Sequence, residues 1–124
     1  MYIDIEYIDK TLYDKVSEIV GTTFVNVHPR ANIERLNQFA MVRVSRIIND
    51  RGAYKSTTAF VDIYVRIKDS GVENITKINE LTNKVMALFP YSDEVFSAIT
   101  PELTFGDVEV EFTRVMIRME LIIK

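Results

Sequence analysis

Hydrophobic side chains near the N-terminus recur at the spacing of an amphipathic helix. Leu12, Val16 and Val20 fall on one helical face, with Tyr13 and Ile19 beside them, and Gly21 follows where a terminating glycine belongs. Asp9 precedes this pattern and is predicted to cap the first turn, where its carboxylate would complement the helix dipole. The pattern predicts a helix that begins after Asp9 and ends at Gly21.

Three stretches that follow have the composition or the alternation of β-strands. Residues 22–28 form a short segment rich in β-branched side chains that ends before Pro29, which predicts a first strand. Residues 30–37 are polar and predict a loop. Residues 39–48 predict a second strand. In the third stretch one face is apolar over five alternate positions, Ala59, Val61, Ile63, Val65 and Ile67. The tetrapeptide 49–52 predicts a turn, so the second and third strands are expected to pair as a hairpin.

The rest of the chain predicts one more helix and one long strand. Apolar positions from Val72 to Phe89 follow helical spacing, and Pro90 closes the segment. Residues 91–102 are predicted as a loop. From Leu103 to Lys124 the chain is strand-like, but its apolar positions change parity near Thr113, which predicts a β-bulge or a sharp bend.

These segments give the order α-β-β-β-α-β in one domain, residues 1–124. Runs of strands flanked by helices predict an α+β fold, an antiparallel β-sheet with two amphipathic helices packed on one face. The chain is 48% hydrophobic with only four glycines and three prolines, which excludes a disordered class. Its apolar runs are too short to span a membrane and its N-terminus is acidic, unlike a signal peptide, so a soluble cytosolic domain is expected.

Few residues suggest catalysis or metal binding. The chain has no cysteine and one histidine, His28, which excludes thiolate zinc sites, cysteine nucleophiles and multi-histidine metal sites. No carboxylate stands at a recognisable spacing to orient His28, so a surface histidine is favoured. Glu109 and Glu111 share a face of the predicted strand and could hold a cation or act as an acid–base pair, although a solvated strand face gives the same spacing. The scattered glycines form no phosphate-binding loop, and no cofactor is predicted.

Charge is divided along the chain. Residues 30–68 carry eight basic and three acidic side chains, whereas residues 69–111 carry two basic and nine acidic ones. The two blocks could pair within one subunit or between neighbouring subunits. A phosphate-binding surface is a further interpretation of the basic block, although the pI near 5.2 weighs against general DNA binding. The basic residues are Arg30, Arg35, Arg43, Arg46, Arg51, Lys55, Arg66 and Lys68.

The polar faces of the long strands carry a mixture typical of protein interfaces. Phe60 and Tyr64 share one face with Arg66, and Met41 shares the neighbouring face with Arg43. Aromatic, methionine and arginine side chains on an otherwise polar sheet are enriched at the centres of interfaces. The alternative is that another part of the same chain covers this face.

The order of elements resembles that of a known family. The passage from Arg51 to Asp69 runs from a turn through a long strand and a short break towards a helix, and the helix itself includes Ile75–Phe89. With the preceding helix and the strand that ends the chain, this is similar to the tail-terminator, tail-completion and neck-ring (head-to-tail connector) proteins of tailed bacteriophages.

The resemblance implies a non-enzymatic structural protein of the virion, assembled in the host bacterial cytoplasm as a ring of heterologous subunit contacts. Such a ring lies at the head–tail junction or the tail end. Its partners are portal, neck or tail-tube proteins, and DNA can pass through its lumen without sequence specificity; no membrane is involved. The interface candidates are Arg43, Arg46, Phe60, Tyr64 and Arg66. The competing interpretation is a non-enzymatic small-ligand or peptide-binding module of a bacterial system, and a small enzyme is least favoured.

Overall fold

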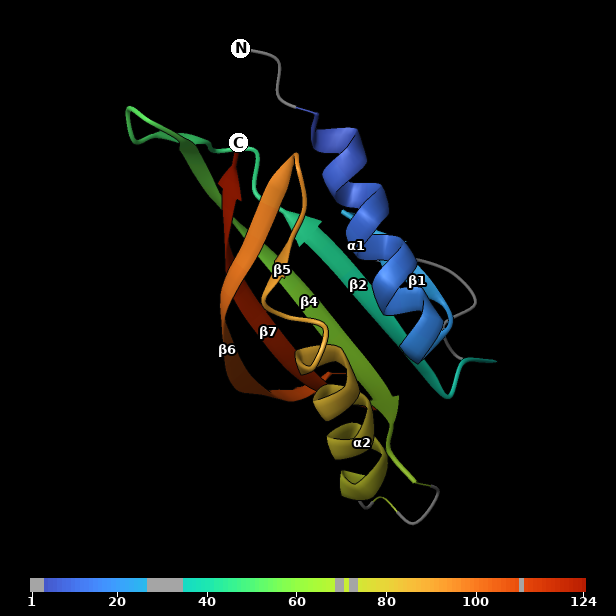
Figure 1. The fold of residues 1–124 in the computed structure, drawn as a ribbon. Coiled ribbons are helices and arrows are strands. Elements are labelled where there is room, and N and C mark those ends of the chain that lie inside the picture. The colour runs from blue at the N-terminus through green and yellow to red at the C-terminus, as the bar shows by residue number, and fades with distance from the viewer. Residues whose placement is uncertain (1–3, 27–34, 69–70, 72–73, 110) are drawn as a thin grey trace.

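The computed structural model describes residues 4–26, 35–68, 71, 74–109 and 111–124. It is an α+β fold in which two helices lie over one curled, mostly antiparallel sheet (Figure 1). In chain order the elements are α1 (Ile5–Val20), β1 (Thr23–Val25), β2 (Gln38–Val44), β3 (Asn49–Asp50), β4 (Lys55–Arg66), α2 (Ile75–Met86), β5 (Tyr91–Ser92), β6 (Phe96–Glu109) and β7 (Phe112–Ile123).

The strands lie in the order β1-β2-β4-β7-β6-β5, and the short β3 pairs with the start of β4. The expected hairpin of the second and third strands is confirmed, because β2 and β4 pair antiparallel with Val42 opposite Val61. The expectation of a purely antiparallel sheet is wrong at one edge, where β1 runs parallel to β2. Residues 26–37 separate these two strands and provide the long connection that parallel pairing requires.

The first helix begins earlier than the sequence pattern indicated. Asp4, not Asp9, is the N-cap, and its carboxylate accepts a hydrogen bond from the Tyr7 amide at 3.0 Å. Ile8 is buried and extends the apolar stripe by one turn, so Asp9 lies inside the helix. The predicted end is confirmed: the Gly21 amide donates to the Ser17 carbonyl at 3.0 Å, with Gly21 at φ +93°.

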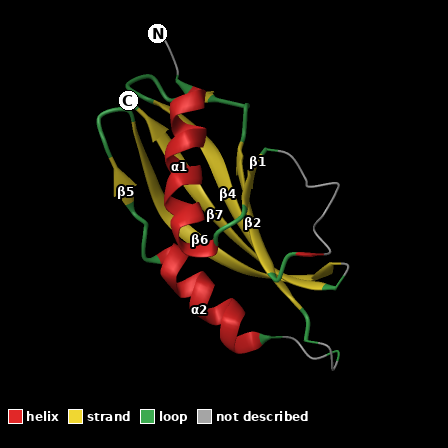
Figure 2. Cartoon of the chain, turned by 90° about the vertical axis from the view of Figure 1, so that its right-hand side faces the viewer, coloured by secondary structure: helices red, strands yellow, loops and turns green. Residues whose placement is uncertain are grey.

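Both helices bury their apolar faces in one core against the same side of the sheet (Figure 2). From α1 the core takes Ile8, Leu12, Val16 and Val20; from α2 it takes Ile78, Leu81 and Val85. The sheet contributes alternate positions, including Val61 and Ile63 of β4 and Val115 and Ile117 of β7. Even-numbered residues of β4 and β7 therefore lie on the opposite side, here called the open face.

The C-terminal third differs most from the sequence prediction. Residues 91–102 are not a loop, because β5 pairs with the start of β6, Tyr91 opposite Ala98. The last segment is not one bent strand either: β6 and β7 form a hairpin that reverses between Glu109 and Phe112, with Glu111 at φ +68°. The change of parity thus marks the turn between two strands, and not a bulge or bend within one strand. The true register shifts lie in β6, between Ile99 and Glu102 and between Phe105 and Val108.

A second, smaller apolar cluster lies on the open face. Phe39 of β2 and Tyr64 of β4 stack with ring centroids 4.4 Å apart, and Phe112 of β7 meets Phe39 edge-on at 5.1 Å. Phe24 and Leu36 pack against these rings. One end of the open face is therefore closed by side chains of the same chain. Among the described helices, none is both long and apolar enough to cross a membrane.

Candidate interaction surfaces

Arg43 and Asp62 form an ion pair at the middle of the open face. Asp62 lies on β4 and is fully buried, and it accepts from Arg43 Nε at 3.0 Å and from Arg43 Nη2 at 3.3 Å. The guanidinium lies over the Phe60 ring, 4.5 Å from its centroid, and its Nη2 is 3.6 Å from the Met116 sulfur. The two-point contact fixes the Arg43 guanidinium against the Asp62 carboxylate, and the Phe60 ring packs against the guanidinium.

Arg66 is held at the closed end of the open face. Its Nε donates to the Leu36 carbonyl at 2.9 Å, its Nη1 lies 3.1 Å from Glu111 Oε2, and its guanidinium covers the Phe112 ring at 4.7 Å. These contacts tie the end of β4 to the start of β7 and to the segment before β2. Tyr64 is only 2% exposed and is enclosed in the same aromatic cluster.

Arg46 lies away from the other interface candidates. It follows β2 and reaches α1, where its Nη2 is 2.9 Å from Asp9 Oδ2. Asn26 donates to the same carboxylate oxygen at 3.1 Å. Four of the five residues proposed from sequence, Arg43, Phe60, Tyr64 and Arg66, therefore share the open face, while Arg46 links the sheet to a helix.

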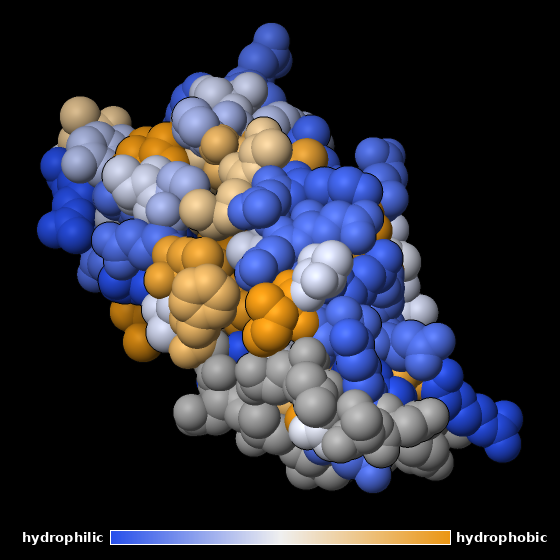
Figure 3. Space-filling model, turned by 90° about the horizontal axis from the view of Figure 1, so that it is seen from below, coloured by the Kyte–Doolittle hydropathy of each residue, from blue (hydrophilic) through white to orange (hydrophobic). Residues whose placement is uncertain are grey.

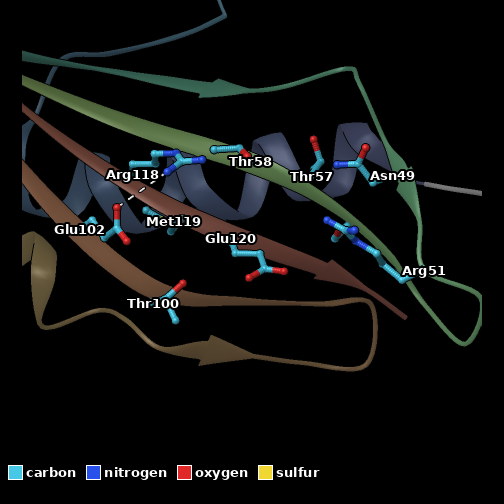
Figure 4. Close-up of a pocket in the computed structure, with 10 residues that line it drawn as sticks. Asn49, Arg51, Thr57, Thr58, Thr100, Glu102, Arg118, Met119 and Glu120 are labelled. Atoms are coloured by element: carbon cyan, nitrogen blue, oxygen red, sulfur yellow. Dashed lines mark hydrogen bonds and ion pairs between the residues drawn. The ribbon is translucent and has the colours of Figure 1, made fainter.

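A polar pocket of about 320 Å³ adjoins the open face at the other end of β4 (Figure 4). Arg118 of β7 and Glu102 of β6 point towards each other across it, 3.8 Å apart, with Thr58 beside them. Arg51 enters from the turn after β3 and donates to the Ser56 hydroxyl at 3.2 Å. The pocket therefore combines cationic, anionic and hydroxyl groups on a floor of β4 and β7.

The outer edge of β6 has no counterpart in the sequence predictions. Only its first residues pair with β5, so from Ile99 to Glu109 the strand has β7 as its one neighbour among the described residues; we call this segment the free edge. Leu103 is opposite Ile117 and Phe105 is opposite Val115, so both point to the helix-bearing side. They are 38% and 69% exposed, because α2 packs mainly on β4 and β7. Figure 3 shows apolar side chains gathered on the lower side of the molecule.

Asp93 organises the turn between β5 and β6 through four hydrogen bonds. The donors are the hydroxyls of Tyr91 (2.6 Å) and Tyr7 (2.8 Å) and the amides of Val95 (2.7 Å) and Phe96 (3.0 Å). Burial alone would raise the pKa of this carboxyl, but the hydrogen bonds outweigh burial and lower the pKa to about 2. The same carboxylate raises the pKa of Tyr91 to about 12. Because Tyr7 belongs to α1, the cluster fastens the first helix to the turn between β5 and β6.

The residues considered for catalysis or metal binding do not form a cluster. Glu111 occupies the turn after β6 and pairs with Arg66, whereas the Glu109 side chain and His28 lie outside what the structure describes. Across the described positions, no group of three or more His, Cys, Asp or Glu side chains could hold a metal ion.

No protein-family model matches the sequence, and no curated protein matches it.

Proposed function

We propose that this chain is a structural subunit that assembles with copies of itself into a ring at the head–tail junction or tail end of a tailed bacteriophage. The observation that carries self-assembly is the free edge of β6 with exposed Leu103 and Phe105. An open strand edge presents unpaired backbone donors and acceptors, and adjacent apolar side chains favour a protein partner over water.

The form of the free edge supports a limited, specific contact. Register shifts on both sides leave one regular segment, Glu102–Phe105, between them. Bulges are a common means of preventing indiscriminate strand pairing. On the helix-bearing side Leu103 and Phe105 extend the core surface beyond α2, where a neighbouring subunit would bury them.

The phage assignment rests on the order of elements and on the resemblance that it carries. The proposal is supported by the order of the first helix, the central hairpin and the second helix, which is the order on which the resemblance to tail-terminator and connector-like subunits rests. In that role the protein is non-enzymatic, its partners are portal, neck or tail-tube proteins, and its location is the virion. A heterologous contact, in which two different surfaces meet, closes into a ring when the rotation allows it.

The test is the native mass of the purified protein over a concentration series, with negative-stain images, for wild type and two matched variants. Phe105→Lys places a charge on the free edge, while Ile47→Lys places one at another exposed apolar residue, 77% exposed after β2. We expect closed rings for wild type and Ile47→Lys, and a shift to monomers for Phe105→Lys. Rings that survive Phe105→Lys would show that the free edge is not the contact.

The polar pocket favours a second candidate function, a module that binds a small ligand or peptide. Arg51, Arg118, Glu102 and Glu120 line it, so a ligand with both acidic and basic groups would be complementary. A strictly monomeric protein that also fails to bind portal and tail proteins, yet binds a zwitterionic peptide saturably, would favour this candidate.

A further inference from the structure

A second cavity, of about 530 Å³, lies where β4 ends and α2 begins. Its walls come from three segments that are far apart in the sequence: the start of β2, the end of β4 with the residues after it, and the first turn of α2 with its N-cap. We call it the basic cavity. It is lined by Asn37, Gln38, Val65, Arg66, Ile67, Lys68, Asn74 and Lys77.

The charge of the basic cavity is one-sided. Three of its described lining residues, Arg66, Lys68 and Lys77, are cationic, and none of those described is acidic. Lys68 makes no ion pair with any described residue. Lys77 has only a loose ion pair, 3.9 Å from Glu80, and Glu80 is closer to Lys84, at 3.1 Å. The two lysines therefore bring positive charge that the carboxylates among the described residues offset only in part.

The remaining polar groups hold the walls in place. Arg66 is fixed by the Leu36 carbonyl and by Glu111, and its amide donates to the Asn37 carbonyl at 2.8 Å. The Asn74 side chain accepts from the Lys77 amide at 3.3 Å. Two flexible ammonium groups beside a fixed guanidinium form a combination suited to an oxyanion, because each contributes charge-assisted hydrogen bonds.

We propose that the basic cavity binds a phosphate group, held chiefly by Lys68 and Lys77. Free phosphate and the backbone of a nucleic acid present the same oxyanion, so both are sources of the group. The inference does not depend on ring assembly, and binding can be measured on whatever oligomer the protein forms.

The test compares wild type with Lys68→Gln/Lys77→Gln and with the control Lys84→Gln. Lys84 lies on the same helix, is more exposed than Lys77 and does not line the cavity. Inorganic phosphate is titrated at low ionic strength while amide NMR shifts are followed, and a labelled DNA duplex is titrated by fluorescence anisotropy. Loss of a cation from the first turn of α2 does not weaken that helix, and thermal unfolding verifies that each variant is folded.

We expect shifts centred on residues 65–68 and 74–77 and a dissociation constant raised roughly tenfold or more in the double variant, since two charge-assisted contacts are lost. Lys84→Gln should change the constant by less than about twofold. Binding of phosphate alone would identify a free phosphate as the source, and much tighter binding of the duplex would identify a nucleic-acid backbone. Equal affinity in wild type and the double variant, or binding of neither probe, would overturn the proposal.

Discussion

Asp62 is a charged residue placed in the interior of the protein. It is a fully buried carboxylate, and the two hydrogen bonds from Arg43 supply the opposite charge that such a group needs. Arg43 is 38% exposed at its side chain, so water can solvate the guanidinium if the carboxylate is removed. Removing Arg43 is therefore expected to lower the free energy of unfolding more than removing the Asp62 charge, because Asp62 stays buried when Arg43 is lost.

This inequality gives a prediction for the free energy of unfolding. Arg43→Leu should destabilise the protein by about 3 kcal/mol or more, because it removes two charge-assisted hydrogen bonds from a carboxylate that stays buried, and Asp62→Asn by about 2 kcal/mol. Asp14→Asn, which breaks the exposed Lys10–Asp14 pair on α1, should cost less than about 0.5 kcal/mol. Urea unfolding measures all three. A cost for Arg43→Leu as small as that of Asp14→Asn would contradict a buried, paired Asp62.

The ionisation of Asp93 makes the stability of the fold depend on pH. Its pKa of about 2 is below the ordinary value, so the folded state holds its proton less tightly than the unfolded state. The resulting stability is present above about pH 4 and is lost as pH falls towards 2, up to about 2 kcal/mol. For Tyr91 the sign is reversed: its pKa of about 12 gives stability below about pH 10 that is lost as pH rises towards 12.

Asp93→Asn should therefore be less stable than wild type at neutral pH and should lose less stability on acidification. Unfolding by urea at a series of pH values between 7 and about 2 measures both effects. Glu6→Gln, an exposed change in the first turn of α1, serves as the control. Parallel pH profiles for wild type and Asp93→Asn would show that the four hydrogen bonds do not persist in solution.

At the scale of elements, the sequence pattern predicted α1, β1, β2, β4 and α2 and the strand character of the last segment, whereas it missed the short strands β3 and β5 and the extent of β6. The β6 strand carries two register shifts, one beside Thr100 at φ +50°, so its side chains do not alternate regularly from end to end. Pro101 and the polar residues before it resemble a loop in sequence, although pairing with β7 makes this segment a strand. Long-range pairing outweighed local propensity there.

The sequence predicted which residues share a face of the sheet, but not which of them are exposed. Strand alternation correctly placed Arg43, Phe60 and Arg66 on a common face, because that depends only on period and register. Whether a side chain on that face is exposed depends on tertiary neighbours. Tyr64 is enclosed because Phe39 and Phe112 come from other strands, and Phe105 is exposed because α2 packs over β4 and β7 instead.

For the molecule as a whole, several basic side chains are paired within the chain. Arg43 pairs with Asp62, Arg46 with Asp9, and Arg66 with Glu111, the last joining the basic block to the acidic one. Pairing within the subunit was one of the two interpretations open from sequence, and these contacts agree with it. A neighbour would have to break such pairs to use their charges, whereas Leu103 and Phe105 are exposed without any such cost.

Salt dependence separates the two modes of assembly. If subunits join through the free edge and its apolar side chains, raising the salt from about 0.05 M to about 1 M should leave the oligomer intact or strengthen it, because apolar burial is not screened. If they join through the opposite charge blocks, the same change should dissociate the oligomer, since exposed charges are screened within a few ångströms at high salt. Sedimentation velocity at both salt concentrations gives the mass directly. Dissociation at high salt, with Phe105→Lys still assembling at low salt, would replace the free edge by the charged surfaces as the contact.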